Sequence, residues 1–96
     1  MAVEWTSTQS AEKNCPPGKE FVFREPSGRE CGRARNVREL FELIRKAPLS
    51  SVLFHANGSH YSPWLEMLGE RELARRFRSV KGNSESVRSA LLRFSR

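Results

Sequence analysis

The chain has 96 residues and a formal charge of +6, and 38% of its residues are hydrophobic. A chain of this length can build one hydrophobic core, and its composition favours a globular domain over a disordered one. No stretch approaches the roughly 20 apolar residues of a membrane span, and the first five residues lack the basic and apolar regions of a secretory signal. The sequence therefore predicts a single cytoplasmic domain without a membrane partner.

The charge comes from an unusual set of residues. Arg outnumbers Lys by thirteen to four, and all 11 acidic residues are Glu. The guanidinium group of Arg forms a rigid fork of donors that suits phosphate, whereas Lys is a hydrated point charge. A polyanion is therefore a natural partner class. A GC-rich or heat-adapted genome explains the same excess of Arg without a ligand, and the composition alone does not separate the two explanations.

The organisation of the chain follows from turn and breaker residues. Residues 1–18 are polar, contain an isolated Trp5 and end in Pro16-Pro17-Gly18, so we expect a flexible arm before one domain at 19–96. Two β-rich segments, 21–25 and 30–33, flank good turn residues and predict a hairpin.

Helical signals follow the hairpin. Asn36 and Glu39 match a capping box that opens a helix ending before Pro48. Residues 51–61 fit either a strand entering a turn at Asn57-Gly58 or a helix. Further helices are expected from Ser62 to Gly69, over 70–79 and from about residue 84. The predicted fold is α+β: an N-terminal hairpin with three to four short helices, with residues 51–61 deciding whether a third strand exists.

A short pattern in the second half of the chain resembles a small archaeal domain family of unknown function. The resemblance is carried by His55, by Tyr61-Ser62-Pro63-Trp64-Leu65 and by Leu68-Gly69-Glu70-Arg71-Glu72-Leu73-Ala74. It implies an archaeal, cytosolic α+β domain, and it brings no activity. Here Ser59-His60 replaces the family's Asn-Asp, and a basic surface replaces its acidic one. Apolar residues of this pattern at helical spacing are interpreted first as core.

Motifs for catalysis or cofactor binding are not evident. Cys15, Cys31, His55 and His60 are the residues that could bind zinc, but 15 residues separate the two cysteines instead of the two to four of a zinc knuckle. In a reducing cytosol the cysteines are expected to be free thiols. No Asp, no Gly-rich phosphate loop and no nucleophile motif is present. We therefore expect a binding protein that is not an enzyme and has neither cofactor nor metal.

Two groups of arginines are the strongest functional signal. Residues 70–96 contain eight basic and three acidic residues, and on the helix expected there three arginines share one face. A second group runs from the hairpin into the first helix. If the two groups join into one surface, that surface would follow the phosphates of RNA or DNA with little sequence specificity. The predicted phosphate contacts are Arg71, Arg75, Arg78, Arg88, Arg33 and Arg35.

Two further expectations bear on the function. Tyr61 and Trp5 are the aromatic residues expected to be exposed and able to stack on bases. The alternative function is a protein-binding or homo-oligomerising adaptor whose arginines only solvate the surface. The salt dependence of the affinity distinguishes the two functions, because phosphate binding weakens steeply with salt and binding through an apolar interface does not. The oligomeric state does not follow from the sequence.

Overall fold

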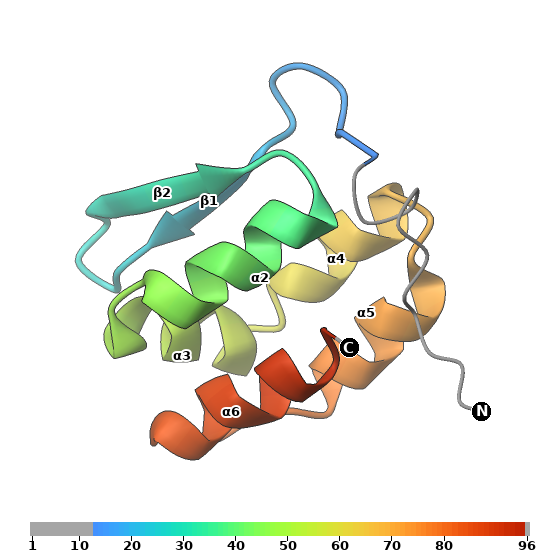
Figure 1. Ribbon diagram of the computed structural model, residues 1–96. Helices are drawn as coiled ribbons and strands as arrows, with labels where there is room; N and C mark the ends of the chain where they lie inside the picture. The colour runs from blue at the N-terminus through green and yellow to red at the C-terminus, as the bar shows by residue number, and fades with distance from the viewer. Residues whose placement is uncertain (1–12, 96) are drawn as a thin grey trace.

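The computed structural model describes residues 13–95 as a β-hairpin followed by five helices (Figure 1). The predicted α+β class with an N-terminal hairpin is confirmed, and the described residues form five helices where three to four were expected. Trp5 and the rest of residues 1–12 lie outside the described residues. The elements are β1 (Phe21–Arg24), β2 (Glu30–Ala34), α2 (Val37–Lys46), α3 (Leu49–Asn57), α4 (Tyr61–Met67), α5 (Arg71–Arg78) and α6 (Glu85–Arg93).

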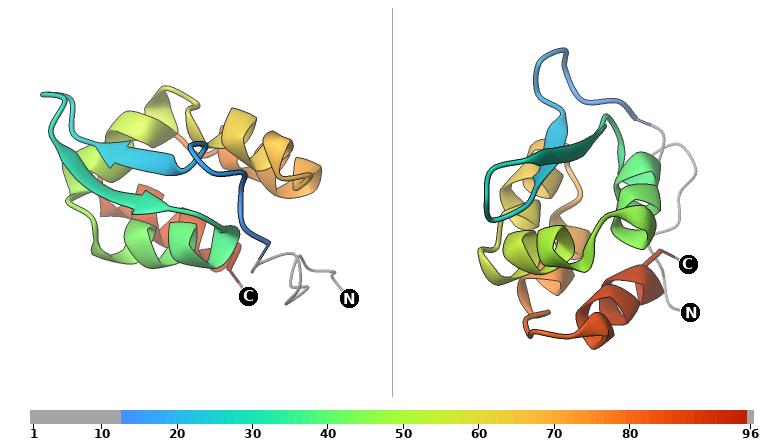
Figure 2. Two further views of the ribbon diagram at one scale, coloured as in Figure 1. Left: turned by 90° about the horizontal axis from the view of Figure 1, so that it is seen from above. Right: turned by 90° about the vertical axis from the view of Figure 1, so that its left-hand side faces the viewer.

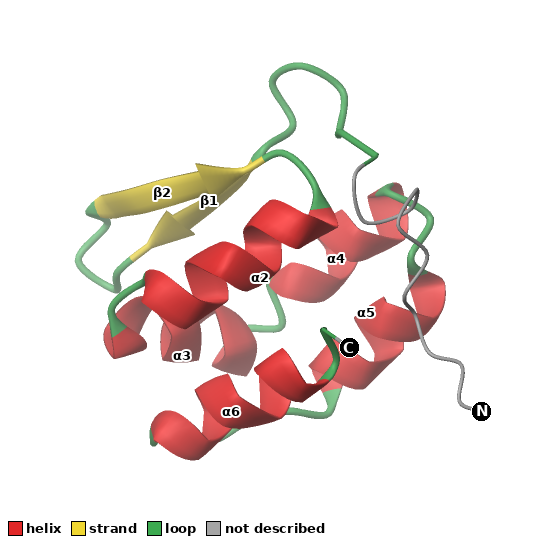
Figure 3. Cartoon of the chain, viewed as in Figure 1, coloured by secondary structure: helices red, strands yellow, loops and turns green. Residues whose placement is uncertain are grey.

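The elements form three tiers. Figures 1 and 2 show the hairpin lying across one side of α2, α3 and α4, with α5 and α6 on the other side. Strand β1 contacts α3 and β2 contacts α2, while α6 packs on α2 and α3, and α5 on α4. Figure 3 shows strands only in the hairpin, so in the described part of the chain helices form most of the core. The hairpin and α5 are consequently far apart.

The hairpin is held by alternating apolar residues and by one glycine. Phe21 and Phe23 are buried, as the period of two predicts. They pair with Ala34 and Gly32 of β2 in an antiparallel register that shifts between Phe23 and Arg24. A Cβ at Gly32 would come within 2.8 Å of the side chain of Leu43 on α2. Gly32 therefore lets the hairpin approach α2 closely.

Helix α2 begins as the capping box predicts. The side chain of Asn36 accepts a hydrogen bond from the backbone N–H of Glu39 at 2.9 Å. Glu39 in turn accepts one from the backbone N–H of Arg35 at 2.8 Å, one residue before the position usual for this motif. The described end of the predicted arm is attached to this cap, because the backbone N–H of the buried Cys15 donates to the carbonyl of Arg35 at 2.7 Å.

Residues 49–57 resolve the ambiguity of the sequence in favour of a helix. Within residues 13–95 there is no third strand, and Asn57-Gly58 ends helix α3 instead of forming a hairpin turn. The amide of Asn57 pairs with the backbone of Gly82, donating to its carbonyl at 2.8 Å and accepting from its N–H at 3.0 Å. This pair ties the end of α3 to the connection between α5 and α6.

Among the described residues, one buried polar side chain has no hydrogen-bond partner. Ser51 in α3 is completely buried, and its hydroxyl makes no hydrogen bond within the described structure. An unpaired buried hydroxyl destabilises a fold, so Ser51→Ala is expected to raise the free energy of unfolding by about 1 kcal/mol. Denaturant unfolding measures the change. Ser84→Ala is the matched control: it removes the N-cap of α6, and it should lower the free energy by about 1 kcal/mol. A loss of stability in both variants would contradict the prediction.

The state of the two cysteines and the lengths of the helices complete the description of the fold. Cys15 and Cys31 are both free thiols, and burial raises the pKa of Cys15. Among the described residues no helix is both long and apolar enough to cross a lipid bilayer.

Candidate nucleic-acid interface

Helix α5 presents an exposed face made of arginines. Its apolar residues Leu73, Ala74 and Phe77 are buried against the rest of the domain, which leaves the other face to the solvent. All four arginines of the helix are exposed: Arg71, Arg75, Arg76 and Arg78. Four arginines against one glutamate give the helix a charge of +3.

Three of these arginines are held by carboxylates. Glu72 accepts hydrogen bonds from Arg75 and Arg76, the latter at 3.1 Å between Nε and Oε2, and these bonds lower the pKa of Glu72. Arg78 reaches Glu66 on α4 at 2.8 Å. Exposed ion pairs contribute less than about 1 kcal/mol each. A phosphate can therefore replace a carboxylate here at small cost.

Arg71 differs from its neighbours. It is the first residue of α5, is exposed, and has no hydrogen-bond or ion-pair partner among the described residues. The N-terminus of a helix carries a partial positive charge, so a cation at this position is electrostatically unfavourable. A bound anion would relieve the repulsion, since anions are stabilised at helix N-termini.

Arg88, predicted as a phosphate contact, instead caps a helix. Its Nη1 lies 2.8 Å from the carbonyl of Ile44, 3.1 Å from that of Arg45 and 2.8 Å from that of Ala47, at the end of α2. Its Nε donates to Glu85 at 2.9 Å, and its side chain is only 16% exposed. The last carbonyls of a helix lack partners within the helix. Because Arg88 supplies those partners, we remove it from the predicted phosphate contacts.

Arg33 and Arg35 lie near the hairpin in tight ion pairs. Arg33 donates to Glu30 at 2.7 Å, and Arg35 donates to Glu39 at 2.8 Å. These hydrogen bonds lower the pKa of both glutamates and raise the pKa of both arginines. Each of the two arginines thus faces one carboxylate, so this group has less free positive charge than α5.

The elements that carry the two basic groups lie apart in the fold. Figures 1 and 2 show β2 at one side of the layer formed by α2, α3 and α4, and α5 at the other side. This placement of the elements does not support the possibility that both groups join into one phosphate-binding surface. Arg71, Arg75 and Arg78 come together on one helix, and Arg33 and Arg35 form a separate group.

Tyr61 is not the exposed aromatic residue that we expected. It is 1% exposed, stacks on Phe21 with ring centroids 5.2 Å apart, and donates from its hydroxyl to the carbonyl of Val52 at 3.3 Å. Burial raises its pKa. The aromatic residue exposed in its place is Phe54 on α3, at 37%. Phe54 follows two other apolar residues, Val52 and Leu53, and this run gives no sign in the sequence of which residue is exposed.

His55 and His60 form a hydrogen-bonded pair whose tautomers are fixed by their surroundings. The backbone N–H of Arg24 donates to Nε2 of His55 at 2.9 Å. Burial first, then His60 and Arg24, lower the pKa of His55 to about 4, so its ring is neutral at neutral pH and its proton lies on Nδ1. That proton is donated to Nδ1 of His60, 3.0 Å away. His60 is consequently an acceptor at Nδ1 and carries its own proton on Nε2.

Cys15 and Cys31 do not form a metal site together with the two histidines. In the described part of the chain no three His, Cys, Asp or Glu side chains form a group that could hold a metal ion. The resemblance to an archaeal domain family remains a prediction. No protein-family model, no curated protein and no solved structure matches this chain.

Proposed function

We propose that this protein binds RNA or DNA through phosphate contacts from helix α5, with little sequence specificity. The observation that carries the proposal is the exposed face of α5, where four arginines accompany a single glutamate. Contacts to phosphates position a protein on nucleic acid without reading its bases. Arg71, Arg75, Arg76 and Arg78 are the proposed contacts.

The state of these arginines supports the proposal. Arg71 has no partner among the described residues, and the other three are held only by exposed carboxylates on α4 and α5. Such pairs orient the guanidinium groups at little cost in free energy. The hairpin group is a weaker candidate, because each arginine predicted there has its own carboxylate.

A pair of triple variants tests the proposal. Changing Arg71, Arg75 and Arg78 to Gln should lower the affinity for single-stranded RNA about tenfold or more at low salt. It should also reduce the slope of log K against log salt by about 2, because each lost phosphate contact removes about 0.7. Fluorescence anisotropy at several salt concentrations measures both quantities.

The matched control removes the same charge elsewhere. Changing Arg29, Arg33 and Arg35 to Gln lowers the net charge equally, on or beside the hairpin. We expect this control variant to bind only slightly more weakly than the wild type and to keep most of the slope of log K against log salt. Equal effects of the two triple variants would mean that net charge, and not the face of α5, determines binding.

A further inference from the structure

An open groove lies between helix α3 and the turn of the hairpin. Its volume is about 600 Å³, within the range of sites for small ligands. None of its lining residues is acidic and none is Lys or Arg; they include Pro26, Leu53, Phe54, Asn57, Gly58 and His60. The groove is therefore suited to a group that is largely apolar and uncharged.

Phe54 is held in this groove although it is exposed. Among the described residues only Phe54 and Met67 are large exposed hydrophobic side chains. The ring of Phe54 packs edge-on against the rings of His55 and His60, with centroids 5.1 and 5.0 Å away. These contacts fix a partly exposed aromatic ring, and a fixed ring loses little entropy when a planar ligand stacks on it.

The histidine pair adds a hydrogen-bond donor to the groove. The backbone N–H of Arg24, Nδ1–H of His55 and Nε2–H of His60 form a chain in which each group donates toward the next. Such chains polarise their members and strengthen the last donor. His60 lines the groove, its Nε2 lies beside Gly58, another lining residue, and this nitrogen has no hydrogen-bond partner among the described residues. The groove thus combines an aromatic ring with an N–H that needs an acceptor.

A cation lies beside the groove and connects it to α5. Nζ of Lys81 contacts the hydroxyl of Ser59 and donates to the carbonyl of Ala56 at 3.1 Å, close to Gly58 and His60 in the chain. Lys81 follows Arg78 of α5 by three residues, so their Cα atoms are at most about 11 Å apart. Lys81 therefore places one positive charge beside the groove and close in the chain to α5, whereas the groove itself is lined by no Lys, Arg or acidic residue.

We propose that this groove takes one unpaired base of a single-stranded nucleic acid, stacked against Phe54 and accepting a hydrogen bond from Nε2 of His60. A nucleobase presents a planar aromatic face together with ring-nitrogen and carbonyl acceptors, which match the two features of the groove. The neighbouring phosphates would contact Lys81 and α5, and this part rests on the proposed function. Because the site takes an unpaired base, we expect single strands to bind more tightly than duplexes.

Phe54→Ala tests the base site, with Met67→Ala as the matched control on the other exposed hydrophobic residue. Phe54→Ala should weaken binding of oligoadenylate roughly 5- to 150-fold, the range for loss of one stacked base. It should not change binding of an abasic oligomer of equal length, and Phe54→Trp should restore binding. Met67→Ala should have no effect on either. Equal losses in the Phe54→Ala and Met67→Ala variants would overturn the proposal.

Adenosine separates this proposal from the phosphate contacts, because it has a base and no phosphate. Added at millimolar concentration to the labelled wild-type protein, it should shift the NMR signals of the Phe54 and His60 rings, and the triple α5 variant should respond equally. Shifts at both rings without oligonucleotide binding to α5 would support the base site and reject the proposed function. Salt-dependent oligonucleotide binding with no shift at either ring would reject the base site alone.

Discussion

Replacing Arg88 by Met is expected to lower the free energy of unfolding by about 2 to 4 kcal/mol. The change leaves the carbonyls of Ile44, Arg45 and Ala47 without their donor at a partly buried helix end. Met keeps much of the apolar stem of Arg, so the loss reports mainly on hydrogen bonds. Chemical denaturation monitored by circular dichroism measures it.

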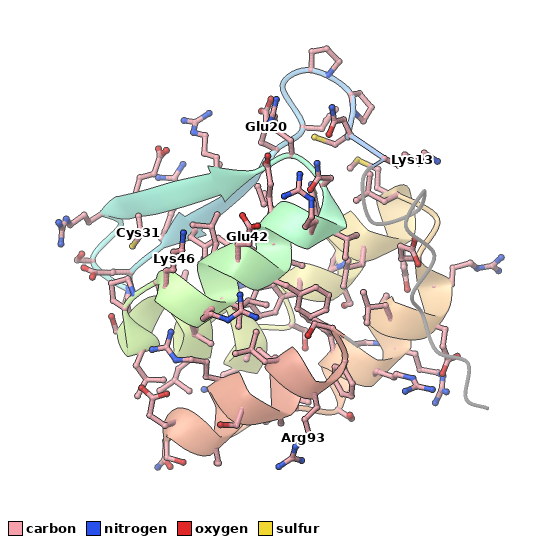
Figure 4. All side chains as sticks on the ribbon, in the orientation of Figure 1. Lys13, Glu20, Cys31, Glu42, Lys46 and Arg93 are labelled. Atoms are coloured by element: carbon pink, nitrogen blue, oxygen red, sulfur yellow. The ribbon has the colours of Figure 1, made fainter. Side chains whose placement is uncertain are left out.

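Arg93→Met on the same helix is the control for Arg88. Arg93 is exposed, has no partner among the described residues and projects away from the body of the molecule (Figure 4). Its replacement should change the stability by less than about 0.5 kcal/mol. Arg88→Lys should recover only part of the loss, because a single ammonium group lacks the fork of donors. Equal stability of the Arg88→Met and Arg93→Met variants would show that Arg88 is not a helix cap.

The protein is expected to lose stability in mild acid because of His55. The pKa of His55 is about 4 in the fold, against 6.5 as its ordinary value, so below pH 6.5 the unfolded chain binds more protons. The stabilisation is complete above pH 6.5 and is lost as the pH falls toward 4. Between pH 8 and pH 5 the free energy of unfolding should fall by about 2 kcal/mol. Denaturation curves at several pH values measure it.

The groups around His55 allow this effect to be isolated. His60 and Arg24 are the charged or titratable groups that, with burial, lower its pKa, and Tyr61 packs against its ring with a raised pKa. Glu39 and Glu72 have pKa values below 4.5, so their ion pairs weaken only at lower pH. His55→Phe should be less stable at pH 7 and nearly independent of pH between 8 and 5. A wild-type stability that is flat over this interval would refute the assignment.

Local signals predicted part of this fold well. The hairpin followed from alternating phenylalanines and turn residues, and the start of α2 followed from Asn36 and Glu39, since all these interactions join residues close in sequence. Gly69 also ends α4 as expected, with a positive φ of 88°. In each case the residues that determine the structure lie within a few positions of one another.

Three features were missed from the sequence. Two of them involve partners distant in sequence, and the third was missed because the helix start was placed one residue too late. Asn57-Gly58 resembled a hairpin turn. The actual partner of Asn57 is the backbone of Gly82, 25 positions away, which a local pattern does not reveal. The carbonyls that Arg88 caps are 41 to 44 positions away. The burial of Tyr61 was predictable: positions 61, 64, 65 and 68 have the spacing of one buried helix face, and all four are buried. Starting this helix at Ser62 hid that pattern.

The proposed binding through α5 is tested most directly by titrating the wild-type protein with single-stranded RNA over a series of salt concentrations. We expect binding at low salt and a fall of log K with log salt with a slope of about −3, as the four proposed phosphate contacts require. No binding at the lowest salt, or an affinity that does not change with salt, would contradict the proposal. Either result would identify the arginines of α5 as a solvated surface and favour a protein partner.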